Sequence, residues 1–273
     1  MKYEQRIVAF IDILGFKNAI EKSNTDDEEY ERILRTLKKL KERFVDRIAQ
    51  EGDKRDYNVN KDNQYIQVSD SLIISRPIDE PGGFSLFLAD CAFAMRTLLF
   101  ESGFLCRGAI TFGNLYHKGT IIFGEAFIKA YQEEPKAKFP IIKFNEELIH
   151  EIKKYPRPFY SVNEEEKFIK EICRKIEIQN SFEYYIDYFT DSDDYLKNPI
   201  MSNTSAYYQN LRYIIIDKFK SAREINDKCT RNKIIDKYDW MREQFNIEAK
   251  KYKVKEIQNL KDYINAFHDH ESQ

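Results

Sequence analysis

The chain of 273 residues is long enough to form one domain with a sizeable appendage and to bury a hydrophobic core. It carries 44 lysine and arginine residues against 46 aspartate and glutamate residues, so it lacks the basic excess of a dedicated nucleic-acid-binding protein. Aromatic residues make up 14% of the chain, which is too many for a disordered polar polymer. We therefore expect a folded protein with no nucleic-acid partner.

The cysteine pattern and the N-terminal segment indicate the compartment. The four cysteines contain no C-x-x-C pair, which argues against a zinc knuckle and predicts buried or inert thiols. The first apolar run, residues 7–16, contains Asp12 and is too short to span a bilayer. With no signal peptide and no transmembrane candidate, we expect a cytoplasmic protein without a membrane partner.

The N-terminal part of the chain begins with a strand and a helix. Residues 7–11 are β-branched and aromatic, which predicts a strand buried on both faces. Thr25 and Glu28 form a capping-box pattern ahead of apolar residues at helical spacing, which predicts a helix over residues 26–49. Residues 51–63 are polar and are expected to form a loop.

A hairpin and an apolar helix follow. Two short apolar runs, residues 65–68 and 72–75, flank Ser69-Asp70-Ser71, which predicts a tight hairpin with Asp70 at its tip. Residues 84–100 are apolar nearly all round. Such a helix must be covered on most sides by the sheet or by a second subunit.

Three further segments complete the first half. Residues 104–112 are strand-like, residues 114–123 are expected to pair back onto them, and residues 139–144 supply a last strand. Gly124 opens a short helical stretch that ends near Pro135. The order of elements predicts an α+β sandwich with helices packed on a largely antiparallel sheet.

The sequence pattern changes after residue 145. Charged helical segments are predicted from there to the C-terminus, separated by one long loop over residues 187–202. We therefore divide the chain into a first domain, residues 1–145, which contains the predicted sheet, and a helical extension, residues 146–273. The predicted helices are residues 146–154, 164–176, 205–219 and 231–267.

Three charged residues lie where the pattern calls for apolar ones. Asp12 ends a buried strand, where it either caps a helix, pairs with a lysine or binds a metal ion. Asp70 at the hairpin tip is either a turn residue or a second ligand, because two carboxylates at one sheet edge can hold hard cations. Arg107 is either a surface cation or a phosphate ligand.

Four segments together form a recognisable combination of motifs: Phe10-Ile11-Asp12-Ile13-x-Gly15-Phe16, Ser69-Asp70-Ser71, the glycine-rich region of Arg107, and Gly124-x-Ala126-x-x-x-Ala130-Tyr131-x-Glu133. This combination resembles the class III nucleotidyl cyclases, and among them the bacterial pyrimidine cyclases of anti-phage signalling. The resemblance covers residues 5–145. It implies a palm-type, ferredoxin-like sandwich for this part of the chain.

The resemblance also implies roles for individual residues. It assigns two Mg²⁺ or Mn²⁺ ions to Asp12 and Asp70, with the carbonyl of Ile13 as a further ligand. Together with Asp12 and Asp70, we count Arg107 as a candidate catalytic residue. Backbone N–H groups at a helix N-terminus would bind the triphosphate. The implied substrate-binding residues are Ile13, Leu14, Gly15, Phe16, Lys17, Tyr65, Gln67 and Ser69.

Three positions depart from the family pattern. Ile128 and Gln132 replace the Asn and Arg that stabilise the transition state. Either Arg107 or Lys129 substitutes for them, or the site is slow, or it binds nucleotide without turnover. Ile66 stands where many members have a purine-reading Lys, which favours a pyrimidine substrate.

The resulting hypothesis is an enzyme that converts CTP or UTP to a 3′,5′-cyclic nucleotide and pyrophosphate by two-metal catalysis. We expect a homodimer whose active sites straddle the interface, a role in anti-phage signalling and a downstream cyclic-nucleotide effector. Two alternatives remain open. One is a degenerate cyclase-like protein that binds nucleotide for regulation, and the other is a palm-type oligonucleotide synthetase.

Overall fold

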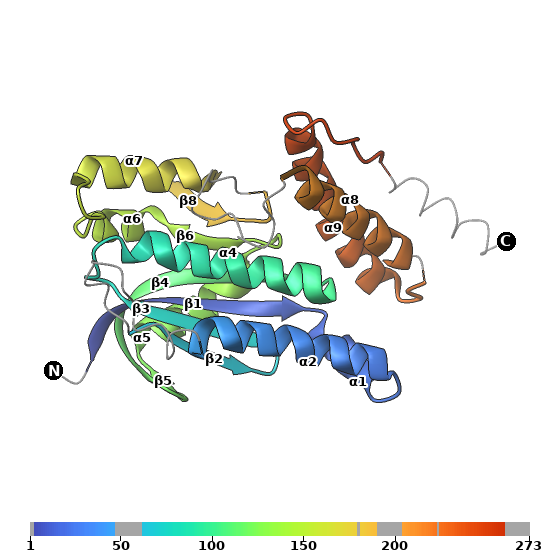
Figure 1. The fold of residues 1–273 in the computed structure, drawn as a ribbon, viewed down its shortest axis with the longest axis horizontal. Coiled ribbons are helices and arrows are strands. Elements are labelled where there is room, and N and C mark those ends of the chain that lie inside the picture. The colour runs from blue at the N-terminus through green and yellow to red at the C-terminus, as the bar shows by residue number, and fades with distance from the viewer. Residues whose placement is uncertain (1–2, 47–61, 179–180, 190–203, 223, 260–273) are drawn as a thin grey trace. The chain divides into compact units, whose positions relative to one another are not determined.

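The computed structural model describes residues 3–46, 62–178, 181–189, 204–222 and 224–259 (Figure 1). The chain divides into two compact units, Met1–Leu196 and Lys197–Gln273. The first unit contains the sheet, and in the second the structure describes two helices. The candidate residues named above all belong to the first unit.

The first unit is built on an eight-stranded mixed sheet with the order β2-β3-β1-β4-β6-β8-β7, and β5 pairs with β4. Every neighbouring pair is antiparallel except β4 and β6, which are parallel. The strands are β1 (Glu4–Leu14), β2 (Gln64–Val68), β3 (Ser71–Pro77), β4 (Leu105–Lys118), β5 (Ile121–Phe123), β6 (Ile142–Asn145), β7 (Arg174–Ile178) and β8 (Ser181–Ile186).

Helices separate most of these strands along the chain. Those of the first unit are α1 (Phe16–Ser23), α2 (Asp27–Lys41), the π-helix η1 (Glu42–Asp46), α4 (Gly83–Ser102), α5 (Glu125–Glu133), the 3-10 helix η2 (Glu134–Lys136), α6 (Glu146–Ile152) and α7 (Val162–Ile172). The second unit contains α8 (Thr204–Ala222) and α9 (Lys228–Ala249). The predicted α+β class with a helical C-terminal part is confirmed.

The first four strands of the sheet have ferredoxin-like topology. Chain order gives strand, helices, two strands, helix, strand, and the spatial order is β2-β3-β1-β4 with all three pairs antiparallel. The central strand β1 runs from Glu4 to Leu14 and is buried on both faces, as its apolar run predicts. Val8 and Phe10 of β1 lie on the face of the sheet that α5 covers. The residues that alternate with them point to the opposite face, which α2 and α4 cover in Figure 1.

The apolar helix α4 is a core helix of this unit. It packs on α2, β1, β3 and β4, and the Phe84 ring meets Phe144 of β6 at a centroid distance of 5.4 Å. Its length and composition would suffice for a membrane span, but most of its apolar window is buried in the fold. The helix therefore gives no reason of its own to expect a second subunit.

Three expectations for the first half are corrected in detail. Helix α2 is capped by Asp26, whose carboxylate accepts the N–H groups of Glu28 and Glu29, and not by Thr25. It ends at Lys41 and continues only as a π-helix, while the last predicted residues, 47–49, lie outside the described part. Residues 114–118 do not fold back but continue β4: Asn114 and Leu115 pair with the start of β1, and residues 116–118 pair with β5, which alone returns onto β4.

The prediction for residues 164–176 is wrong at its C-terminal end, and residues 139–144 are not the last strand. Helix α7 ends at Ile172, and the alternating apolar residues Ile176 and Ile178 belong to strand β7. Strand β8 pairs with both β7 and β6, so the sheet continues beyond residue 145. The compact unit Met1–Leu196 therefore extends beyond the predicted first domain, residues 1–145. Of the predicted loop, residues 190–202 lie outside the described residues.

The cysteine prediction holds for three of the four thiols. Cys91, Cys106 and Cys173 are buried, and burial raises the pKa of each thiol. Cys229 is exposed near the start of α9, so of the two predicted alternatives, buried or inert, the buried one does not hold for this residue.

Close backbone packing places α5 on the sheet. Gly124 immediately precedes α5 and has a φ of 146°, and an ideal Cβ there would lie 2.4 Å from the carbonyl oxygen of Asn114. The helix then sets Ala126 and Ala130 against β1 and β4. Only glycine fits at position 124, and a larger residue there would displace α5.

We predict that Gly124→Ala lowers the free energy of unfolding by about 2–4 kcal/mol, because strain at φ and steric overlap with backbone act together. Gly119→Ala is the matched control, since that glycine has a φ of 58° but no atom within 4 Å of the ideal Cβ. The control should cost about 1–2 kcal/mol. Chemical denaturation of both variants measures the difference, and equal losses would show that α5 docks less tightly than described.

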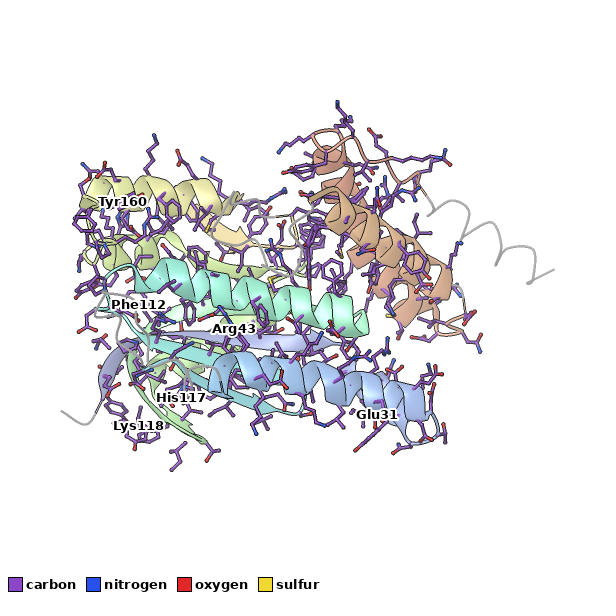
Figure 2. All side chains as sticks on the ribbon, in the orientation of Figure 1. Glu31, Arg43, Phe112, His117, Lys118 and Tyr160 are labelled. Carbon is purple, nitrogen blue, oxygen red and sulfur yellow. The ribbon has the colours of Figure 1, made fainter. Side chains whose placement is uncertain are left out.

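A buried polar cluster joins the start of β1 to β3 and β4. The Arg6 side chain is fully buried, and its Nε donates to Ser75 Oγ at 3.1 Å while Nη1 donates to Asp62 at 2.6 Å. The Nδ1 of His117 lies 2.8 Å from the same Ser75 hydroxyl (His117 is labelled in Figure 2). Burial and the Arg6 charge lower the pKa of His117 to about 4. The imidazole is therefore neutral in the folded protein at neutral pH.

This shift predicts a pH dependence of stability. Between pH 6.5 and 4 the unfolded chain protonates His117 while the folded protein does not, so stability is fully present above 6.5 and falls as the pH drops. The loss reaches about 3 kcal/mol near pH 4. In His117→Gln this part of the slope should disappear, as followed by urea unfolding at a series of pH values. An unchanged slope would contradict the assignment.

Candidate active site

Asp12 sits on the α5 face of β1, two residues beyond the apolar cluster. It alternates with Val8 and Phe10, which pack against α5, so strand geometry points its side chain to the same side of the sheet. The strand ends two residues later, at Leu14, and Gly15 turns the chain into α1 with a φ of 82°. Asp12 is half-buried and lies where the apolar side chains on this face of β1 end.

The β2–β3 hairpin brings the second aspartate to this place. Val68 pairs with Ser71, leaving Ser69 and Asp70 as a tight turn, and Ser69 adopts a left-handed φ of 54°. The backbone N–H of Ile13 donates to the carbonyl of Asp70 at 2.7 Å. The predicted convergence of Asp12 and Asp70 at one edge of the sheet is therefore present in the backbone.

Arg107 stands directly opposite Asp12 on the neighbouring strand β4. Its guanidinium Nε donates to the carboxylate of Glu134, at the start of η2. Glu134 is almost completely buried; burial and the nearby charges of Asp12 and Asp70 raise its pKa, while Arg107 opposes the rise. Three carboxylates and one guanidinium therefore form a single electrostatic cluster.

Glu134 was not predicted from the sequence, although a signal exists. Ala126, Ala130 and Glu134 are spaced by four residues, so all three lie on the buried face of α5 and its 3-10 extension. A charged residue that continues a buried helical face is unusual and indicates a partner on the sheet. The partner, Arg107, could be identified only once β4 was placed.

A second cation on this part of the sheet was also missed. Lys143 of β6 is buried, and its Nζ donates to Glu183 of β8 at 2.9 Å and to Glu133 of α5 at 3.3 Å. The two carboxylates compensate its charge, and the contacts connect the end of α5 to the added strands. Lys143 lies beside Ala109 of β4, two positions along the strand from Arg107.

The α5 residues that the comparison with the family pattern singled out lie away from this cluster. Ile128, Lys129 and Gln132 are all exposed, on the side of the helix away from Ala126 and Ala130. They do not join the cluster of their own chain.

The β2 residues that the resemblance singles out lie on both faces of the sheet. Ile66 is buried in the apolar cluster beneath α5. Tyr65 faces the other way and stacks on Phe44 at 4.8 Å, and the Gln67 amide donates to the Ser69 carbonyl at 2.6 Å. Burial raises the pKa of the Tyr65 hydroxyl. The structure therefore places Tyr65 away from the cluster, whereas Gln67 contacts the hairpin tip and Ser69 is part of it.

The turn after β1 combines core and exposed residues. Ile13 and Phe16 are buried, and the Phe16 ring packs against Phe104. Leu14 is half-buried, and the Lys17 side chain is mostly exposed. The first-turn N–H groups of any helix have no partner within the helix, and in α1 no side-chain cap accepts from them.

The donor set fits a hard divalent cation. Among the described residues, no group of three or more acidic, histidine or cysteine side chains is arranged to hold a metal ion alone. Magnesium sites in nucleotide enzymes commonly use one or two carboxylates and complete their shell with substrate phosphates and water. Asp12 and Asp70 supply such a pair of oxygen donors, and the Ile13 carbonyl lies in the same stretch of backbone.

Comparison with known proteins returns structures but no sequence family. No family model and no curated protein matches the chain. The adenylyl cyclase CyaB from P. aeruginosa aligns at 12% identity with a TM-score of 0.46, covering 71% of this chain and 98% of that one. The guanylyl cyclase domain of the RhoGC fusion protein from the fungus Blastocladiella emersonii, as a double mutant, aligns at 17% identity with a TM-score of 0.43, covering 68% and 95%. The guanylyl cyclase Cya2 aligns at 9% identity with a TM-score of 0.43, covering 71% and 95%.

Proposed function

We propose that the chain is a nucleotidyl cyclase whose site is centred on Asp12 and Asp70. The observation that carries the proposal is the hydrogen bond from the Ile13 amide to the Asp70 carbonyl, which fixes two carboxylate-bearing segments side by side at the end of a ferredoxin-like sheet. Arg107 adds a cation next to this pair. Carboxylates for divalent ions and a guanidinium for phosphate oxygens are the groups that phosphoryl transfer requires.

The proposed reaction is an intramolecular displacement. The 3′-oxygen of a nucleoside triphosphate attacks the α-phosphorus, the bond from that phosphorus to the bridging oxygen breaks, and pyrophosphate leaves while the hydroxyl proton passes to solvent. Two Mg²⁺ or Mn²⁺ ions on Asp12 and Asp70 would supply activation of the hydroxyl and neutralisation of the phosphates. The first-turn N–H groups of α1 bind phosphate oxygens, and Arg107 stabilises the charge that develops on them.

We propose a pyrimidine nucleotide as the substrate. The position of a purine-reading lysine is taken by Ile66, which lies in the core beneath α5 and has no polar group for a base. CTP or UTP, with the smaller ring, is the better candidate. We further propose a cytoplasmic enzyme whose cyclic nucleotide acts on a separate effector in anti-phage signalling.

One observation favours a binding function instead. Ile128 and Gln132, at the places of the usual transition-state Asn and Arg, carry no charge and lie on the exposed side of α5. A domain that holds nucleotide for regulation needs only the aspartates and the phosphate contacts. A palm-type oligonucleotide synthetase would use the same carboxylates, and its products would distinguish it.

We also propose a homodimer, supported by apolar side chains on the exposed surface of α5 and β5. Ile121, Phe123, Ile128 and Tyr131 are each about half exposed, and Tyr3 packs against Phe123 at the margin. Such a group of exposed apolar residues is typical of an interaction surface. We propose that in a two-fold pair formed by this surface, α5 of one chain lies near the carboxylates of the other.

The direct test is incubation of the protein with each ribonucleoside triphosphate and Mn²⁺, followed by chromatographic identification of the products. We expect cyclic CMP or cyclic UMP from the wild type and none from Asp12→Asn or Asp70→Asn. Both variants should keep the wild-type melting temperature or exceed it, because each removes one of two neighbouring negative charges. Linear oligonucleotides would favour the synthetase, cyclic AMP would refute the base assignment, and retained activity in either variant would refute the two-metal site.

A mixing experiment tests the shared site. Arg107 lies beside Asp12 in the same chain, so we propose the exposed Lys129 as the cation that the partner contributes. Asp12→Asn and Lys129→Ala chains should each be inactive alone, and after mixing should recover up to one working site per heterodimer. Light scattering should show a dimer at micromolar concentration. A fully active monomer would contradict the homodimer. A dimer that recovers no activity on mixing would refute only the role assigned to Lys129.

A further inference from the structure

The pair formed by Arg107 and Glu134 raises a question of charge. Arg107 faces Asp12 across two hydrogen-bonded strands, and opposite charges at such positions attract each other. A guanidinium beside the metal-binding carboxylates would repel divalent cations and compete for their ligands. The arrangement works for metal binding only if the charge of Arg107 is compensated by another group.

Glu134 is placed to provide this compensation. Its carboxylate accepts the Nε–H of Arg107, and it comes from a different element, the 3-10 turn at the end of α5. The Glu134 side chain is 6% exposed while that of Arg107 is 27% exposed, so the carboxylate is held beneath the guanidinium and away from solvent. Because the pair is partly buried, solvent and salt screen the interaction between the two charges only weakly.

We propose that Glu134 is a positioning residue that acts through Arg107: it neutralises the guanidinium and thereby leaves the negative charge of Asp12 and Asp70 to divalent cations. This inference rests on the proposed two-metal function. With Arg107 and Glu134 cancelling each other, the two aspartates give the site a net charge of −2 before metal binds. Without the charge of Glu134, the net charge falls to −1 and Arg107 competes directly with the metal.

Two variants separate this role from direct metal ligation. Glu134→Gln keeps the shape of the side chain, and its amide oxygen can still accept the Nε–H of Arg107, so mainly the charge is lost. Adding Arg107→Gln removes the uncompensated cation as well. If Glu134 acts through Arg107, the double variant regains metal affinity; if Glu134 itself binds the metal, it does not.

The experiment measures Mn²⁺ binding to the full-length protein without nucleotide, from the electron paramagnetic resonance signal of free Mn²⁺. We expect Glu134→Gln to bind Mn²⁺ about 10- to 100-fold more weakly than wild type, and Arg107→Gln with Glu134→Gln to return to within about threefold of wild type. Glu133→Gln is the matched control, because this neighbouring glutamate pairs with Lys136 and Lys143 instead. It should change the affinity by less than about threefold.

Each other outcome has one meaning. Wild-type affinity in Glu134→Gln, or a double variant as weak as Glu134→Gln, overturns the inference and leaves the proposed function intact. Wild-type protein that binds Mn²⁺ no better than Asp12→Asn overturns the proposed function and this inference with it. Should Glu134→Gln fail to fold by circular dichroism, Arg107→Gln alone decides: the inference predicts tighter Mn²⁺ binding than wild type, and unchanged or weaker binding overturns it.

Discussion

The hydrogen bond between the Ile13 amide and the Asp70 carbonyl determines the geometry on which the site depends. It ties the end of the central strand to the tip of a hairpin, two points that are far apart in the sequence. Because the bond is made by backbone atoms, it leaves both aspartate side chains for other partners. The pairing of β3 with β1 fixes the register around it, since Asp12 faces Ser71. The site is therefore built into the sheet and not into a separate loop.

The other half of the site depends on how closely α5 approaches the sheet. Gly124 lets the chain pass against the backbone of Asn114, and Ala126 and Ala130 keep the helix low over β1 and β4. One more turn along the same face, the helix delivers a carboxylate to Arg107. The small residues thus allow α5 to pack closely on the sheet, and the ion pair between Glu134 and Arg107 follows them at the end of the helix. Packing and electrostatics specify the same placement of α5.

The sequence was informative where a residue conflicts with its local pattern. Asp12 at the end of a buried strand and Asp70 in a two-strand turn are visible from one segment each, and the strands and helices around them have clear periodicity. Glu134 and Lys143 are not visible in this way, because their importance comes from partners on other strands. Strands β7 and β8 were missed because charged residues interrupt a short alternation that also suits a helix. Contacts between distant segments, which set these features, are not encoded in any one window.

The addition of β8 and β7 beside β6 has a practical consequence for anyone who divides this protein into parts. A fragment ending at residue 145 would keep Asp12, Asp70 and Arg107 but would leave β6, a short and mostly buried strand, with its outer row of N–H and C=O groups unpaired. It would also remove Glu183, so that buried Lys143 kept only one of its two carboxylates. Such an open edge is a template for pairing with other chains, and the fragment would be prone to aggregate. Insolubility of that fragment would therefore say nothing about the proposed metal site, and a boundary after β8 is the one the sheet itself supports.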